Sequence, residues 1–154
     1  MKFKKSMFKD LIFCNNGNLS LIDLTTMGDS SKRGISNKIG KFDSGLKYAL
    51  VILLRNGITT EIISNKISYT FDSVVQRDEN TGKTKEVLQI IQTQGDNVIK
   101  TPTAFALNMG FEWELWMAVR EIYSNCIDED GMMFNKDPER DYDTVIKISG
   151  HELL

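Results

Sequence analysis

Histidine is almost absent from this chain of 154 residues, and the only one, His151, lies near the C-terminal end. A lone histidine leaves neither a cluster of histidine metal ligands nor the histidine of a catalytic triad with a serine and an aspartate. Cysteine is also scarce: Cys14 and Cys126 read as small core residues in a predicted strand and a predicted helix. We therefore expect no disulfide framework, and a reducing, cytoplasmic setting fits best.

Long apolar runs are missing as well. The longest, from Tyr48 to Leu54, is closed by Arg55 and is far too short to cross a bilayer. The basic start of the chain is not followed by the apolar stretch of a signal peptide. A net charge of -2 provides no general attraction to nucleic acid or to anionic lipid. We therefore expect no membrane association and no nucleic-acid partner.

The composition favours an ordinary globular domain. Apolar residues make up 41% of the chain and charged residues 26%, and the length suits one domain, residues 1–154, with a proper core. The ending His-Glu-Leu-Leu, soon after a predicted strand, is compatible with a fragment of a longer chain.

The apolar pattern alternates between strand-like and helix-like segments. It predicts strands at 8–14, 58–64, 66–75, 86–93 and 144–149, helices at 44–55 and within 105–127, and a long loop at 23–37. The segment 78–82 is a natural hairpin loop. The pattern indicates an α+β fold, a two-layer sandwich of a mostly antiparallel sheet with helices on one face.

The second predicted helix carries three polar side chains at spacings of four and then three residues. Glu121, Asn125 and Asp128 therefore rise one above another on one face, while the opposite face carries an apolar stripe: Leu115, Val119, Ile122 and Cys126. A carboxylate and an amide in this arrangement can support metal-assisted chemistry. The alternative is a solvated polar face on a core helix.

A glycine-rich segment precedes the first predicted helix. Gly40 and Gly45 flank its start, where exposed backbone N–H groups carry the positive end of the helix dipole. Glycine lets the backbone approach closely, so such a turn can bind phosphate. The alternative is a turn that only caps the helix.

Taken together, these segments resemble the GHKL ATPase superfamily, which includes gyrase, MutL, sensor histidine kinases, the MORC proteins and a heat-shock chaperone. Residues 121–128 are similar to its N box. Residues 39–47 are similar to its second glycine box, and residues 28–32 to the lid before that box. Residues 15–18 resemble a worn first glycine box. The resemblance covers about 10–65 and 104–150, and it implies a Bergerat-like fold that binds ATP and Mg²⁺.

The chain departs from the family pattern in three ways. The N-box helix comes last, so the order resembles a circular permutation, which a sandwich tolerates. Asn15 stands where the family has the aspartate that reads adenine; an amide can still accept from the adenine amino group. Asp43 stands in place of a glycine and would repel phosphate, by about 1 kcal/mol per pair in water. Leu19 also replaces the last glycine of the first box.

The resemblance implies a role for each matching position. Glu121 would orient and deprotonate the attacking water, and Asn125 would hold Mg²⁺. The remaining cofactor-binding positions belong to the first glycine box, the lid and the second box: Asn15, Gly17, Ser31, Lys32, Gly40, Gly45, Leu46 and Lys47. Asp128 would support the water shell of the metal, or only begin the turn that follows.

Two functions therefore stay open. One is an ATP-binding protein with weak Mg-dependent ATPase activity, a lid that closes over nucleotide, and a protein partner or a homodimer. The other is a non-catalytic GHKL-like binding module, an inhibitory or structural partner of another protein, suited to a virus or a mobile element. Asn15 and Asp43 favour the module, whereas Glu121 and Asn125 favour the ATPase.

Overall fold

The structure, a computed structural model, describes residues 10–26, 44–134, 136, 138 and 140–150. Its elements are β1 (Asp10–Asn15), α1 (Leu21–Thr25), α2 (Ser44–Arg55), β2 (Thr59–Ser64), β3 (Ile67–Arg77), β4 (Thr84–Gln94), β5 (Asn97–Ala106), α3 (Leu115–Asp128), β6 (Met132–Phe134) and β7 (Thr144–Ser149).

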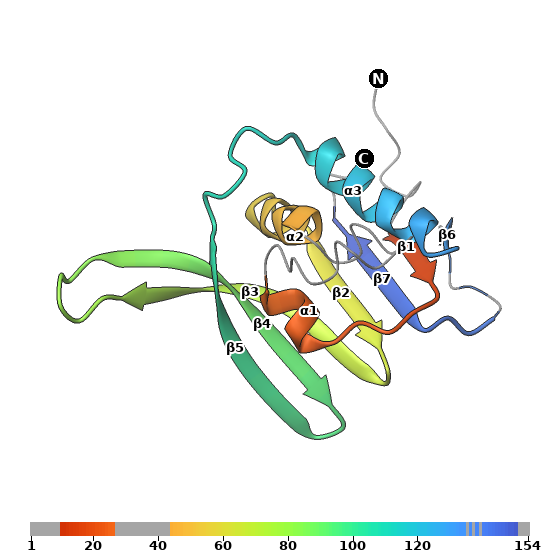
Figure 1. Ribbon diagram of the computed structural model, residues 1–154, viewed down its shortest axis with the longest axis horizontal. Helices are drawn as coiled ribbons and strands as arrows, with labels where there is room; N and C mark the ends of the chain where they lie inside the picture. Colours follow the sequence, from red (N-terminus) through yellow and green to blue (C-terminus); the bar gives the residue numbers. More distant parts are fainter. Residues whose placement is uncertain (1–9, 27–43, 135, 137, 139, 151–154) are drawn as a thin grey trace, which may run out of the picture.

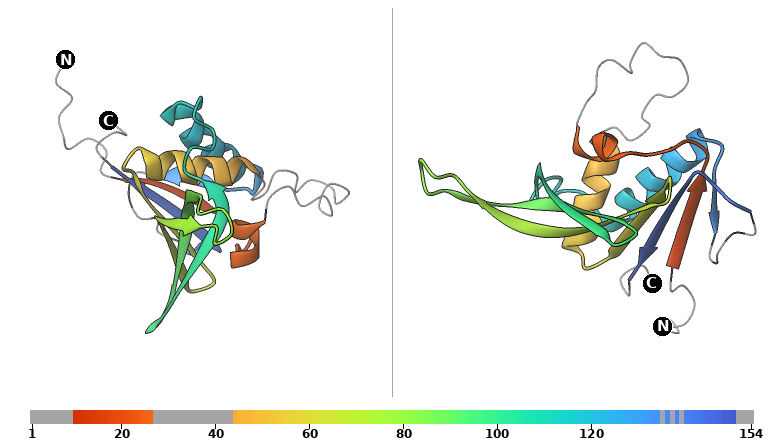
Figure 2. Two further views of the ribbon diagram at one scale, coloured as in Figure 1. Left: turned by 90° about the vertical axis from the view of Figure 1, so that its left-hand side faces the viewer. Right: turned by 90° about the horizontal axis from the view of Figure 1, so that it is seen from below.

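The described strands form one seven-stranded sheet in the order β5-β4-β3-β2-β7-β1-β6, and each pair of neighbouring strands is antiparallel. Helices α2 and α3 lie side by side on one face of it (Figures 1 and 2). The paired strands β3 and β4 extend well beyond the helices (Figure 1). The α+β, two-layer sandwich predicted from the sequence is confirmed.

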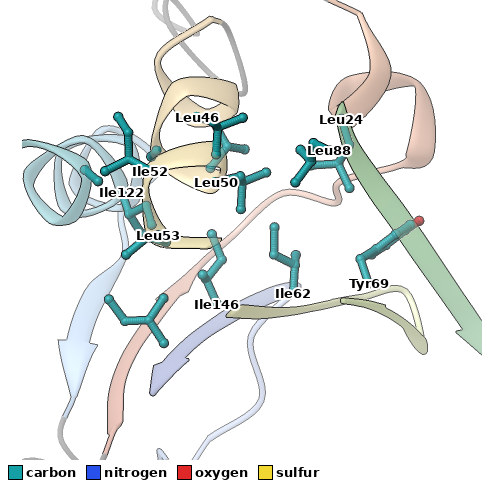
Figure 3. Packing of buried hydrophobic residues seen from close by; sticks show 14 of the residues in the cluster. Leu24, Leu46, Leu50, Ile52, Leu53, Ile62, Tyr69, Leu88, Ile122 and Ile146 are labelled. Atoms are coloured by element: carbon teal, nitrogen blue, oxygen red, sulfur yellow. The ribbon is translucent and has the colours of Figure 1, made fainter. Parts of the chain in front are cut away.

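The hydrophobic core lies between the two helices and the middle of the sheet. Leu46, Leu50 and Leu53 of α2 face Ile62 and Ile146 of the sheet, as Figure 3 shows, and all five are at most 4% exposed. Burying apolar side chains of this size contributes roughly 1.5–3 kcal/mol each. This packing fixes the position of α2 on the sheet, including its first turn, which follows the glycine-rich segment.

Helix α2 has the bounds that the sequence predicts, whereas no strand is predicted at the position of β5. The apolar pattern places residues from 105 onward in a long helical segment, but Phe105 belongs to β5 and α3 begins only at Leu115. Pro102 lowers the strand propensity of 97–106, yet β5 is the edge of the sheet, where a missing N–H is tolerated. The three-residue strand β6 is likewise absent from the sequence prediction.

Strands β1 and β7 are neighbours in the sheet although they lie at opposite ends of the described chain. Asp10 is paired with Ser149, whose hydroxyl donates a hydrogen bond to the Asp10 carboxylate. The start of β1 and the end of β7 therefore lie next to each other. A hairpin between them would join α3, β6 and β7 to β1 without changing the sheet.

Candidate functional site

Glu121 in the middle of α3 lies directly against the first turn of α2. A Cβ atom placed on Gly45 would stand 2.1 Å from Glu121 Oε1 and 2.5 Å from its Cδ, so only glycine leaves room for this carboxylate. The first four N–H groups of a helix have no intrahelical acceptor, and those of Gly45 and Leu46 are among them. The first turn of α2 contains no acidic residue of its own. Glu121 therefore supplies a negative charge at the positive end of α2.

Asn125 lies one turn farther along α3, and its amide nitrogen is buried without a hydrogen-bond partner. A buried amide of this kind costs about 1–3 kcal/mol if it stays unpaired. The part of this face that carries Glu121 and Asn125 is thus only partly exposed to solvent. Asp128 differs, since it is exposed and is the last residue of α3.

The apolar stripe predicted opposite Glu121 divides into two parts. Ile122 and Cys126 are at most 2% exposed and belong to the core. Leu115 and Val119 are only partly buried and line a groove on the outer side of the helix.

Asn15 ends β1 within a row of buried polar side chains. It is paired with Thr144 of β7, which is paired with Ser64 of β2, so the three side chains share one face of the sheet. All three are at most 3% exposed. The row follows directly on the apolar row of Phe13, Ile146 and Ile62 in the core.

The loop after β1 is held over this row by hydrogen bonds. Thr144 Oγ1 donates to the Gly17 carbonyl at 2.6 Å, and the Gly17 N–H donates to the Asp143 carboxylate at 2.8 Å. The Leu19 N–H donates to Ser64 Oγ at 2.8 Å. Gly17 has a φ of +95°, a conformation that other residues rarely adopt. Leu19, where the family pattern has glycine, is a core residue at 2% exposure.

The end of α3 and the end of β1 are joined by short contacts. Cys126 Sγ donates to the Cys14 carbonyl at 3.1 Å, and the Asn16 N–H donates to the Glu129 carbonyl at 3.4 Å. Burial raises the pKa of the Cys126 thiol to about 11, and a hydrogen bond with the backbone of Cys14 partly offsets that effect. Gly131 packs against Cys14 and Cys126 so closely that a Cβ atom would stand 2.1 Å from the Cys14 carbonyl oxygen.

Three parts of the chain thus meet around α3. Its middle contacts the start of α2, and its C-terminal end contacts the end of β1. The structure therefore brings Glu121 against Gly45, with Leu46 and Lys47 following Gly45 in α2. Asn125 lies one turn farther along α3, and Asn15 lies at the end of β1 that the C-terminal end of α3 contacts. Leu46 and Lys47 are both 1% exposed, so they offer a ligand backbone atoms rather than side chains. Ser31, Lys32 and Gly40, together with Asp43, lie outside the described residues.

The site offers few metal ligands of its own. Within the described ranges, histidine, cysteine, aspartate and glutamate form no group of three or more that could hold a metal ion. Mg²⁺ does not need such a cage, since it is often bound by one or two protein oxygens, waters and the phosphates of a substrate. The orphaned amide nitrogen of Asn125 can donate to a phosphate oxygen, whereas the space beside Gly45 is filled by the Glu121 carboxylate, which would have to move for a phosphate to reach the start of α2.

The sequence interpretation did not identify Thr144, Ser64 and Asp143. Each is a common polar residue at the start or end of a strand or in a loop, and it carries no recognisable spacing. They meet only because β7 lies between β1 and β2, which are far from it along the chain. The register of non-consecutive strands is the signal that would have found them.

Comparison with known proteins gives no relative for this arrangement: no family model, no curated protein and no solved structure matches the chain. Among the described residues, no helix is long and apolar enough to span a membrane.

Proposed function

We propose that this chain is an ATP-binding protein of GHKL type in circularly permuted order, with a weak Mg-dependent ATPase activity. The observation that carries the proposal is the contact between Glu121 and Gly45. These residues belong to two motifs that were recognised separately, far apart in the sequence. Their meeting at the start of a helix is what a phosphate site built from both motifs requires.

The arrangement of the strands supports the permuted order. The start of β1 is adjacent to the end of β7. Followed through that point, the elements run α3, β6, β7, β1, α1 and α2. The N box, the first glycine box, the lid and the second glycine box then come in the family's usual order. Cutting a sheet at one hairpin and joining it at another preserves the core.

The residues of the site would divide the work as follows. Backbone N–H groups at Gly45 and Leu46 bind phosphate oxygens, and the Asn125 amide oxygen holds Mg²⁺, which supplies charge stabilisation for phosphoryl transfer. Glu121 withdraws from the helix start when phosphate arrives and accepts a proton from the attacking water. Asn15, in the same row as Thr144 and Ser64, accepts from the adenine amino group through its oxygen.

Ser31, Lys32 and Gly40 keep the roles of lid and glycine-box residues within this proposal. A cytoplasmic location also belongs to it, because Cys14 and Cys126 are both buried thiols.

One observation favours the alternative, a non-catalytic binding module. The Asn15 amide donates to the carbonyl of Asn16 at 2.9 Å, and the Gly17 N–H is bonded to Asp143. Polar groups that a nucleotide would use are thus already satisfied within the protein. A module that keeps the sandwich but has lost its nucleotide would show the same bonds.

Thermal unfolding in the presence of nucleotide separates the two functions. A ligand that binds only the folded state stabilises it by about 2.7 kcal/mol at a hundred times its Kd. We expect ATP with Mg²⁺ to raise the Tm, and ATP with a chelator to raise it less. In Asn125→Ala the additional rise that depends on Mg²⁺ should be lost. An unchanged Tm at millimolar ATP and Mg²⁺ would contradict ATP binding and favour the non-catalytic binding module.

A further inference from the structure

An apolar groove runs along the outer side of α3, facing away from α2. Its volume is about 650 Å³, and five side chains of α3 line it: Leu115, Trp116, Val119, Arg120 and Tyr123. Leu11 of β1 and Met133 of β6 line it from the sheet. Trp116 is 51% exposed, and Tyr123 and Met133 are also exposed. Large contiguous apolar patches on a protein surface mark interaction sites.

Arg120 gives the groove a charge. It is the charged residue among the described residues that line the groove, and its guanidinium lies 5.1 Å from the centre of the Trp116 ring. No carboxylate is paired with Arg120 in the described part of the chain. The carboxylate of Glu114 is bound instead by the indole N–H of Trp116 at 2.6 Å. The groove therefore complements an apolar surface that carries an acidic group.

We propose that this groove is a docking site for an amphipathic helix of a partner protein, with an acidic side chain of that helix paired with Arg120. From Leu115 to Tyr123 the groove extends for about 12 Å along α3, which matches about two turns of a helix. Peptide helices dock through anchors at such spacings, i, i+3, i+4 and i+7. Tryptophan, tyrosine, methionine and arginine are also the residues that protein interfaces favour.

The same charge argues against a second copy of this chain as the occupant. If two copies met through this groove, the Arg120 of each would enter one interface, and like charges there would repel. A segment of another protein that carries an acidic side chain therefore fits the groove better than a second copy does. This site is separate from the contact between Glu121 and Gly45, so it does not depend on the proposed ATP binding.

Two fluorescein-labelled helical peptides test the proposal by fluorescence anisotropy with the full chain. Both have about 14 residues with leucines at i, i+3, i+4 and i+7; one carries glutamates beside the leucine face and the other lysines at the same positions. We expect saturable binding of the glutamate peptide, at least about tenfold tighter than the lysine peptide. Arg120→Glu should reverse this preference, and Arg120→Gln should remove it. Trp116→Ala should weaken both peptides.

Arg77→Glu is the matched control, because it makes the same change of charge on the exposed hairpin end of β3. It should leave the peptide preference as it is in the unaltered chain. Circular dichroism shows that each variant is folded, and Arg120→Gln serves if Arg120→Glu is not. The proposal is overturned if neither peptide binds saturably, or if the preference persists in the folded Arg120 variants.

Discussion

Helix α3 presents two different surfaces to its surroundings. Toward α2 it presents Glu121 and Asn125, and away from α2 it presents Trp116, Arg120 and Tyr123. An ordinary surface helix buries its apolar side and leaves its polar side in water. Here a carboxylate and an amide are partly buried, while two aromatic side chains are exposed. Both exceptions to the usual pattern are places where a function is expected to outweigh packing.

On the two proposals made above, α3 separates two kinds of recognition. The inner side offers charge and hydrogen bonds at the start of a helix, which suits phosphate. The outer side offers apolar area and one cation, which suits a protein segment. Between them, Ala118, Ile122 and Cys126 form the buried ridge that fixes the helix on the sheet. Variants on the ridge, the inner side and the outer side should therefore have separate effects.

The largest effect is expected from a substitution in the buried ridge of α3, because it should disturb the inner and the outer side together. Ile122 is 1% exposed, and Ile122→Ala removes three buried carbon atoms and leaves a cavity, which costs about 2–5 kcal/mol of unfolding free energy. Both surfaces should weaken together, because both depend on the position of α3. Chemical denaturation measures the change, and Ser124→Ala on an exposed position of the same helix should stay within about 0.5 kcal/mol. An equal, small loss in both variants would show that α3 is not anchored through Ile122.

The inner side alone should respond to Glu121→Gln. If Glu121 is the general base, ATP hydrolysis should fall by about 10²-fold or more, while Mg-ATP still binds. Glutamine is as large as glutamate but uncharged, so the substitution removes the repulsion between residue 121 and a phosphate, and affinity should not fall. A phosphate-release assay measures turnover, and the exposed Asp128→Asn provides the control. Equal turnover in Glu121→Gln and the unaltered chain would show that Glu121 is not the general base.

The sequence contained much of the fold and of the inner side. The bounds of α2 were predictable because Gly45 marks its beginning and the left-handed Gly57, with a φ of +74°, follows its end. The spacing of Glu121 and Asn125 placed them on one side of α3. Their burial was not predictable, because it results from the packing of α2 against that side. No periodicity within a single helix reports which neighbour covers it.

The outer side was harder to predict. Trp113 and Trp116 are three residues apart, a spacing that would place both on one side of a helix. However, Trp113 precedes α3 and stacks on Tyr48 with ring centres 5.3 Å apart. Only Trp116 reaches the groove. Met133 reaches it through β6, a strand of three residues that is too short to show an alternating pattern. Tertiary packing, rather than residue type, separates these side chains.

The contact between Gly45 and Glu121 is the central claim, and Gly45→Ala tests it most directly. Its methyl group would occupy the space of the Glu121 carboxylate, a flexible side chain that can move, so the chain should still fold. The methyl group would also obstruct a phosphate that approaches the start of α2. Gly95→Ala is the control for an added methyl group far from the site. The φ of +59° at Gly95 means that alanine there lowers stability, but no atom lies within 4 Å of the added methyl group, so the site should be unaffected.

Isothermal titration calorimetry of Mg-ATP binding to the unaltered chain, Gly45→Ala and Gly95→Ala is the decisive measurement. The account predicts that Gly45→Ala loses about tenfold in affinity, equivalent to about 1.4 kcal/mol, and that Gly95→Ala binds like the unaltered chain. Equal affinities in all three proteins, or no binding to the unaltered chain at millimolar ATP, would contradict it.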